Sequence, residues 1–417
     1  MTDEFRTMLD LLRKSVFGRE MRNNEIKNSY DVCVIAYHQS VLPLVYTALP
    51  QKIAKNECSE FGRICLMQLY NNEQHIYFLQ KVIEIFEKND IDYCVLKGCT
   101  AAQLYNRCEC RISGDVDILI NEADEKKVEM LLSEDLKMAV TPRPKDGHHF
   151  LARHPNGGLF EIHVKLYGST FYNIVLENKL KKGEPYRIIE LKDKFKVYTL
   201  GFNDNLFFLT AHLIKHFVKE GCGIRQITDL LTYVDRYKSE LDFKTYFSVL
   251  KSLRFDVLIK NIFGIGVRFF DLDLPEYDEK FVEAILNDVE NGGNFGFSEK
   301  NRKGFFDSFI ESRTNMNTYK FRFLMSLKLI SGTIPTVLFP SKAYLIGRGY
   351  RYLEKSMLLY PVAYLNRIID VIGVIWLLLK RQRKMDDILF IPDNNECISN
   401  RLKMMECLGI VSRNKKH

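Results

Sequence analysis

The chain has 417 residues and a mass of 48.9 kDa, which is long for one domain, since a domain averages roughly 100–200 residues. Hydrophobic residues make up 46% and charged residues 27%, which excludes an intrinsically disordered chain, and 23 glycines with 11 prolines exclude a collagen-like or linker-rich one. The net charge of +7 is too small for this length to demand an anionic partner.

The ten cysteines form no Cys-x-x-Cys pair, and the chain opens on the charged segment 1–6 and not on a signal peptide. We therefore predict free thiols in a reducing cytoplasm. The longest uninterrupted apolar run covers residues 371–379, far short of the ~20 residues that cross a bilayer. We expect a cytoplasmic protein that is not integral to the membrane.

Residues 1–85 are predicted to form an N-terminal helical region, because apolar residues recur at helical spacing and mark an amphipathic helix over 73–88. The pattern changes at Ile91, and residues 86–200 are predicted to form an α/β domain. Its expected strands and helices, in chain order, are a strand at 92–96, a helix at 100–106, a strand at 115–120, a helix at 124–136 and a hairpin of 148–153 with 159–164. Asn156-Gly157 lies between the hairpin strands and is a strong turn signal.

Helical spacing returns after residue 205 and predicts a helical substrate-binding lobe over 201–300. Helices are expected at 206–217, 227–234, 243–270 and 276–290. Residues 301–417 are predicted to be a C-terminal helical region with a basic tail. The predicted fold class is α+β, with a mixed-sheet lobe, a helical second lobe and helical extensions.

The segment around Asp115 and Asp117 is the most informative part of the sequence. Residues two apart on a strand point to the same face, so both carboxylates share one face. They would repel unless a cation lies between them, and a hard divalent ion such as Mg²⁺ meets that need. The alternative is a pair of solvated acids on an exposed strand face.

Two further features support the interpretation as a metal site. The first strand ends at Lys97-Gly98 directly before a helix, an arrangement in which backbone can approach a phosphate. On the second hairpin strand Glu161 and His163 share a face, so Glu161 supplies a third acid. Three carboxylates beside a phosphate loop suit two-metal phosphoryl transfer.

These residues resemble the DNA polymerase beta-like nucleotidyltransferase superfamily, which combines an apolar strand, a Gly loop opening a helix, Asp-x-Asp and a later acid. More narrowly, the chain resembles the "uncharacterised nucleotidyltransferase" family of bacterial proteins over roughly residues 75–235. The motifs that carry this narrower resemblance are Leu96-Lys97-Gly98, Leu104-Tyr105, the run from Arg111 to Leu119, Phe160-Glu161-Ile162-His163, His212-x-x-x-His216 and Asp229.

The resemblance implies that Asp115 and Asp117 ligate Mg²⁺ or Mn²⁺, and that Glu161 completes the metal site or deprotonates the acceptor. It also implies that Gly98, with Lys97, lies against the triphosphate of an NTP. The usual Gly-Ser of the superfamily is Gly98-Cys99 here, which removes a hydroxyl that often contacts phosphate. Thr100 or Lys97 is the predicted substitute.

Arg111 and Lys215 are further candidates for contacting phosphate. Arg111 stands four residues before Asp115, and its guanidinium fits phosphate oxygens with two bonds; the alternative is a salt bridge to the carboxylate pair. For Lys215 the alternative is a solvated lysine.

Weaker candidates are His163, His212, His216, Arg225 and Asp229. His212 and His216 share a helical face, where zinc binding, substrate contact and core hydrogen bonding are alternatives, and we favour the last two. Arg225 and Asp229 stand four apart and would pair along one helix if they have no part in the site. His163 could orient the other residues of the site, and the alternative is that it is merely partly exposed.

The predicted function is metal-dependent transfer of an NMP from an NTP such as ATP to an unidentified acceptor, with a small molecule favoured. The alternatives are a nucleotide-binding regulatory protein without turnover and a protein- or RNA-modifying enzyme, although no interleaved basic and aromatic motif marks a nucleic-acid surface. Residues 358–379 and the basic run 380–384 suggest peripheral contact with an anionic membrane or a partner. The competing interpretation of that segment is a core helix with a basic end.

Overall fold

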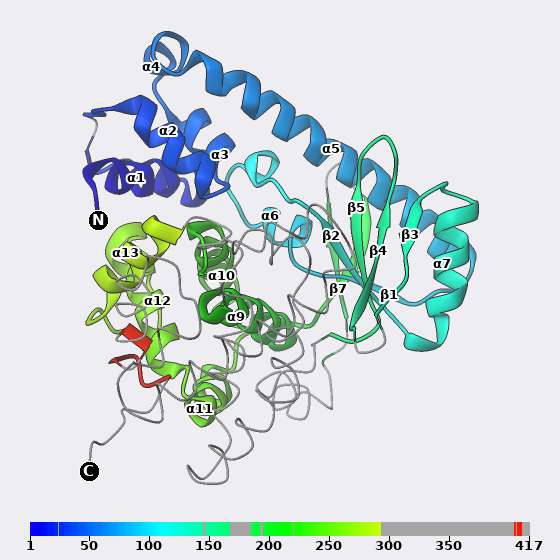
Figure 1. The fold of residues 1–417 in the computed structure, drawn as a ribbon. Helices are drawn as coiled ribbons and strands as arrows, with labels where there is room; N and C mark the ends of the chain where they lie inside the picture. The colour runs from blue at the N-terminus through cyan, green and yellow to red at the C-terminus, as the bar shows by residue number, and fades with distance from the viewer. Residues whose placement is uncertain are drawn as a thin grey trace, which may run out of the picture. The chain divides into compact units, whose positions relative to one another are not determined.

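Figure 1 shows the fold in a computed structural model. The structure describes residues 1–292 except 24, 145–146, 167–183, 185, 192–194 and 220, together with 404–405 and 407–410. These residues all belong to one compact unit. The predicted membrane or partner contact of residues 358–384 lies outside the described residues.

The N-terminal region is helical, as predicted. Its helices are α1 (Asp3–Phe17), α2 (Ser29–His38), α3 (Leu42–Ala48), α4 (Gln51–Asn56) and α5 (Ser59–Lys88). The predicted helix over 73–88 is the second half of α5, which begins at Ser59. The first half was missed because Leu66 and Met67, 68% and 67% exposed, blur the apolar face that a buried helix normally shows.

The sheet has the order β1-β2-β5-β4-β3. Its strands are β1 (Tyr93–Val95), β2 (Val116–Ile120), β3 (Ala139–Thr141), β4 (His149–Arg153) and β5 (Leu159–His163). β2 and β5 run parallel, and the other neighbouring pairs are antiparallel. The predicted strands and the 148–164 hairpin are therefore confirmed. A separate two-stranded sheet, β6 (Arg187–Glu190) with β7 (Lys196–Thr199), was not predicted.

Short helical segments connect these strands. They are α6 (Cys99–Ala102), the 3₁₀ turns η1 (Cys108–Cys110) and η2 (Glu122–Asp124), and α7 (Glu125–Glu134). The helix predicted for 100–106 is thus a single turn, because Gln103 ends it.

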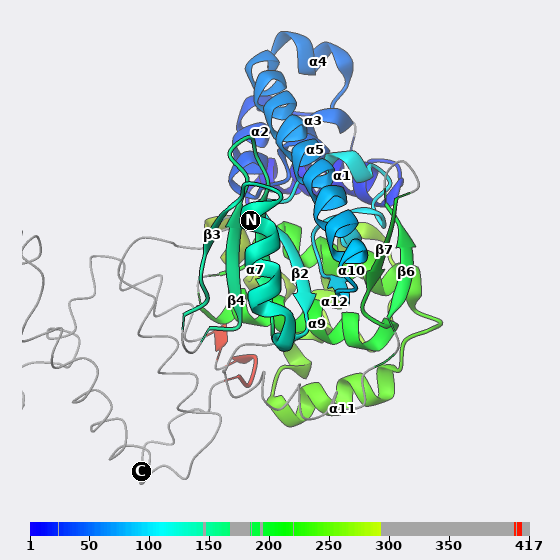
Figure 2. The ribbon, with the colours of Figure 1, turned by 90° about the vertical axis from the view of Figure 1, so that its right-hand side faces the viewer.

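One face of the sheet packs against α5 and α7, which lie in front of the strands in Figure 2. Val116, Ile118 and Ile162 point into this core together with Phe86 of α5 and Leu132 of α7. Because strand side chains alternate between faces, the residues between these apolar ones point to the opposite face. The polar face is therefore fixed by burial of the apolar one.

The described part of the second lobe contains the helices α9 (Phe202–Lys219), α10 (Ile224–Tyr237), α11 (Phe243–Leu253), α12 (Asp256–Phe270) and α13 (Val282–Gly292). The mixed sheet with this helical lobe confirms the predicted α+β class. The stretch predicted as helical over 243–270 is divided at Arg254, which has φ +63° and ends α11. No helix of the described residues combines the length and apolar character needed to cross a membrane.

The N-terminal helices pack onto the helical lobe. The side chain of Gln39, at the end of α2, donates to Val289 O at 2.7 Å and accepts from Ile224 N at 2.9 Å. Arg13 and Arg22 form ion pairs with Asp271, which ends α12. These contacts join residues about 185–260 positions apart in the chain, so the first two helices help to hold the lobe that carries α10.

Candidate active site

Two of the predicted acids face each other across neighbouring parallel strands. Asp117 of β2 is in register with Glu161 of β5, and both lie on the face opposite the apolar core. Asp117 is only 2% exposed, whereas the Glu161 side chain is 26% exposed. Asp115 directly precedes β2 and is half-buried. The structure therefore brings the predicted acids to one end of two adjacent strands.

Two basic side chains converge on Asp117. Lys97 Nζ lies 3.2 Å from Asp117 Oδ1, and His163 Nε2 lies 2.9 Å from the same oxygen and 3.6 Å from Glu161 Oε2. Burial alone would raise the pKa of Asp117, but Lys97 and His163 outweigh burial and hold that pKa well below its usual value. Asp117 is therefore ionised at neutral pH despite its burial.

The pKa values of the neighbouring charged groups depend on the same set of charges. Burial, followed by the charge of Asp117, raises the pKa of Asp115. Burial would lower the pKa of Lys97, but the charges of Asp117, Asp115 and Glu161 raise it. Burial would raise the pKa of Glu161, but the hydrogen bond with His163 and the charges of Lys97 and His149 together lower it. The mutual effects mean that the three carboxylates are close enough to repel one another.

The donor set fits a hard divalent cation. Asp117, Glu161 and His163 offer ligand atoms that all lie within 4.8 Å of one another. Carboxylate oxygens are the ligands that Mg²⁺ prefers, and a divalent charge would relieve the repulsion that raises the pKa of Asp115. Asp115 itself is not in this close group of ligand atoms, so it would approach the ion from the loop before β2.

The predicted phosphate loop has a conformation that requires glycine. Gly98 has φ +60°, and a Cβ there would lie 2.9 Å from Ser113 Oγ. The Thr100 hydroxyl donates to Lys97 O at 3.3 Å, and Thr100 is 6% exposed. The side chain predicted to replace the missing serine hydroxyl is therefore bonded to the loop's own backbone.

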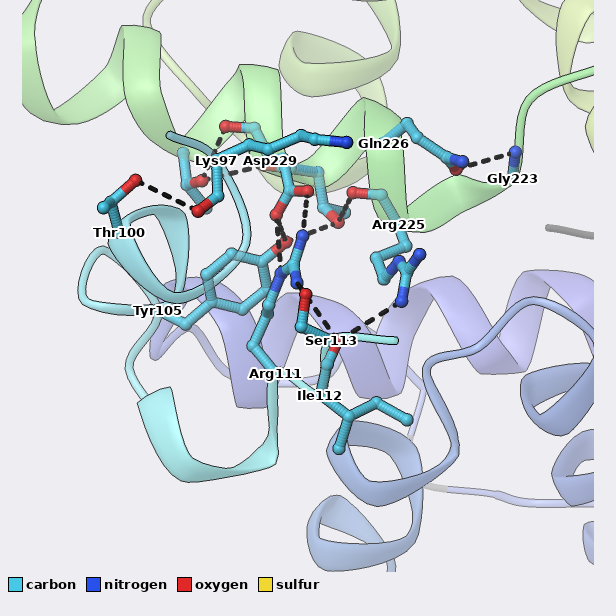
Figure 3. A network of polar contacts seen from close by, with 12 residues as sticks. Lys97, Thr100, Tyr105, Arg111, Ile112, Ser113, Gly223, Arg225, Gln226 and Asp229 are labelled. Carbon is cyan, nitrogen blue, oxygen red and sulfur yellow. Dashed lines mark hydrogen bonds and ion pairs between the residues drawn. The ribbon is translucent and has the colours of Figure 1, made fainter. Parts of the chain in front are cut away.

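Arg111 belongs to a buried polar network, shown in Figure 3. Its Nε and Nη2 donate to the two oxygens of Asp229 at 3.1 and 2.5 Å, and the Tyr105 hydroxyl donates to Asp229 Oδ1 at 2.7 Å. The ion pair that we predicted as the alternative for Arg111 is present, but its partner is Asp229 of α10 and not the Asp115–Asp117 pair. Arg111 is 5% exposed, which leaves it poorly placed for the predicted phosphate contact.

Arg225 does not pair along the helix with Asp229, contrary to the alternative above. Its Nη1 donates to Ile112 O at 3.2 Å (Figure 3), and its Nε has no hydrogen-bond partner among the described residues. Burial, followed by the charge of Arg111, lowers its pKa to about 10. From the other side Asn72 of α5 accepts a hydrogen bond from Ser113 N at 3.1 Å. The loop before Asp115 is thus held by α10 and α5 together.

The α9 candidates lie near the polar face of the sheet. The rings of His212 and His216 are 4.5 Å apart, and burial lowers the pKa of both, to about 4 for His216. Lys97 and Lys215 lower both values further through their charge. Among the described residues, His212 and His216 belong to no cluster of three metal-ligating side chains.

Two histidines of the site were missed as functional residues. His149 pairs in register with His163 on the hairpin, and His148 Nε2 lies 3.3 Å from His149 Nδ1. Burial, followed by the charge of His163, lowers the pKa of His148 to about 4. The sequence did contain a signal for them, because two consecutive histidines stand at the start of one hairpin strand and His163 stands opposite them on the other.

Comparison with known proteins identifies the family of the chain. The sequence profile of a family described as an uncharacterised nucleotidyltransferase matches residues 30–271. The chain belongs to this family. The matched segment contains every residue of the candidate site, and the predicted family is confirmed.

No curated protein matches the chain. Among solved structures, the chain is similar to an antigenic nucleotidyltransferase-like protein from Paracoccidioides brasiliensis. The sequences are 16% identical, the similarity covers 38% of this chain and 74% of that one, and the TM-score is 0.27.

Proposed function

We propose that the protein transfers a nucleoside monophosphate from an NTP to an acceptor and releases pyrophosphate, using a divalent metal ion. The observation that carries this proposal is the pairing of Asp117 and Glu161 on adjacent parallel strands, with Asp115 beside them. Membership of a nucleotidyltransferase family supports the transferase class.

Asp117 and Glu161, with Asp115, would hold Mg²⁺ or Mn²⁺. The ion would neutralise the triphosphate and stabilise the charge that develops on the pyrophosphate. His163 keeps the Asp117 carboxylate in place through its 2.9 Å contact. Glu161, the more exposed of the paired acids, is the group placed to take the proton of the acceptor. Lys97 supplies a positive charge next to the metal ligands and would bind a phosphate oxygen.

A small molecule is the acceptor that we favour, because the modest net charge of +7 and the absence of a basic and aromatic motif in the sequence give little support to a polyanionic partner. A protein side chain or an RNA end would be found by the same assay. In each case the attacking atom is a hydroxyl or amine that must lie in line with the departing pyrophosphate.

The test is pyrophosphate release from each of the four common NTPs with Mg²⁺ or Mn²⁺, over a panel of metabolites and fractionated lysate. Asp117→Asn keeps the side-chain shape but removes the charge, and we expect a loss of at least about 100-fold, as is typical when a transition-state electrostatic contact is removed. Asp92→Asn is the matched control, because Asp92 is exposed on the same domain; it should retain full activity. Equal rates in the Asp117→Asn variant and the wild type would show that the metal assignment is wrong.

The regulatory alternative has a separate signature in this assay. Lys97 already contacts Asp117, so a nucleotide could bind to a site that never turns over. Binding of an NTP and metal without pyrophosphate release from any acceptor would support that function instead.

A further inference from the structure

Three histidines form a cluster beside the carboxylates, on the polar face of the hairpin. His149 and His163 are directly opposed on β4 and β5, and His148 immediately precedes β4. The ring centroids lie 4.6 to 5.4 Å apart. Each ring offers a nitrogen within 4.8 Å of the nitrogens of the other two.

The spacing within the cluster matches a metal centre. Zinc binds imidazole nitrogen at 2.0–2.1 Å, so two ligands of a tetrahedral ion lie about 3.4 Å apart. The Nε2 atom of His148 and the Nδ1 atom of His149 are 3.3 Å apart. The third nitrogen, from His163, lies within 4.8 Å of the other two, so the rings would rotate to close the site around an ion.

A second, independent observation points to a ligand at His163. This side chain is 4% exposed, and its Nδ1 has no hydrogen-bond partner among the described residues. A buried polar atom without a partner costs about 1–3 kcal/mol, so such atoms call for an explanation. Its other nitrogen, Nε2, is already held by Asp117.

We propose that His148, His149 and His163 bind a transition-metal ion of the zinc type, at a site separate from the carboxylate site for Mg²⁺. Imidazole ligands suit zinc and its neighbours, whereas carboxylate and water ligands suit Mg²⁺. Three protein ligands leave a fourth position for water or a substrate atom. His148 and His149 are half-buried, so the ion can enter from solvent.

Asp117 would then link the two sites. Histidines that bind metal through one nitrogen usually present the other to a carboxylate, which fixes the ring and strengthens the ligand. With Nδ1 on the ion, the contact of His163 Nε2 with Asp117 Oδ1 at 2.9 Å supplies that arrangement. Losing such an outer partner typically weakens metal binding by about 10–100-fold.

The experiment is calorimetric titration of the metal-free full-length chain with Zn²⁺ in millimolar Mg²⁺, together with the visible spectrum of the Co²⁺-loaded chain. We expect one zinc ion per chain, undisplaced by Mg²⁺, and the intense absorption of tetrahedral cobalt. The variants His148→Ala and His149→Ala should each weaken binding by more than the roughly 10–100-fold that an outer partner contributes. Asp117→Asn should weaken it by an amount within that range.

Control variants exclude other ligands. His38→Ala changes an exposed histidine on α2, while Cys108→Ser and Cys407→Ser remove the thiols that are exposed among the described residues; all three variants should bind zinc as the wild type does. Circular dichroism checks folding, and glutamine variants at 148 and 149 replace any alanine variant that unfolds.

Failure of the wild type to bind zinc in the presence of Mg²⁺ would overturn the proposal. So would unchanged binding in a variant lacking both His148 and His149, or a cobalt spectrum of the octahedral type. None of these readouts needs nucleotide turnover, so zinc binding without pyrophosphate release would remove the proposed function and leave this site standing.

Discussion

The buried pair of Arg111 and Asp229 offers the sharpest test of how the fold positions the site. It joins the loop before the candidate metal-binding acids to α10, 118 residues further along the chain. We consider three variants: Asp229→Leu, Arg111→Met, and the double variant Arg111→Met/Asp229→Leu. The first two each leave one charged partner without its counterpart, and the third removes both charges.

The magnitude follows from burial and from the bonds made. The side chains of Arg111 and Asp229 are 5% and 9% exposed, and the carboxylate accepts two bonds from the guanidinium and one from Tyr105. Removing one partner of a buried, hydrogen-bonded ion pair costs about 3–5 kcal/mol. Thr228→Val removes only the neutral hydroxyl that bonds Tyr105 and Arg225 O and should cost about 1 kcal/mol.

The assay is urea unfolding followed by circular dichroism, arranged as a double-mutant cycle. We expect each single variant to lose about 3–5 kcal/mol of unfolding free energy, and the double variant to lose clearly less than the sum, with a coupling of about 2 kcal/mol or more. Additive losses, or single losses below about 1 kcal/mol as at a surface pair, would refute the reasoning. In either case the pair would not be what holds the loop.

The remaining predictions concern backbone strain and pH. Gly98→Ala should lower the free energy of unfolding by about 2 kcal/mol, because φ is +60° and the new Cβ would lie 2.9 Å from Ser113 Oγ. The control is Gly114→Ala, whose Cβ meets nothing within 4 Å. In a thermal unfolding experiment it should change the same free energy by under about 0.5 kcal/mol. For His216, burial lowers the pKa from 6.5 to about 4. Between pH 7 and pH 5 the unfolded chain therefore binds a proton that the folded chain does not, and the free energy of unfolding should fall by about 2 kcal/mol from this group. His216→Gln should flatten that dependence, and an unchanged slope would contradict the buried, neutral state.

The local parts of the site were predictable from the sequence, because they depend on alternation along a strand. Val116, Ile118 and Ile162 enter the core, and this burial turns Asp117 and Glu161 to the other face, as their spacing predicted. The hairpin of β4 and β5 followed from its turn residues.

The non-local parts were not predictable in the same way. Nothing in the spacing of residues indicates that β2 pairs with β5, from which β3 and β4 separate it in the sequence, yet this pairing brings Asp117 opposite Glu161. As the alternative to a phosphate contact, Arg111 was expected to pair with the acids four to six positions away, whereas tertiary packing supplies Asp229. Helical spacing likewise suggested Arg225 as the ion-pair partner of Asp229. Instead, the buried guanidinium of Arg111 donates a hydrogen bond to each of the two Asp229 oxygens.

The charge within the site argues that Lys97 prepares the carboxylates and does not take the place of a metal ion. Its ammonium contacts Asp117, which explains why that buried acid stays ionised. One ammonium cannot neutralise three carboxylates, and the pKa of Asp115 remains raised by burial and by Asp117 although Lys97 and Arg225 both act to lower it. Because negative charge remains among these carboxylates, the site would favour a divalent cation over water or a second lysine. The same lysine, released from Asp117 when the ion binds, would be free to meet the phosphates that arrive with it.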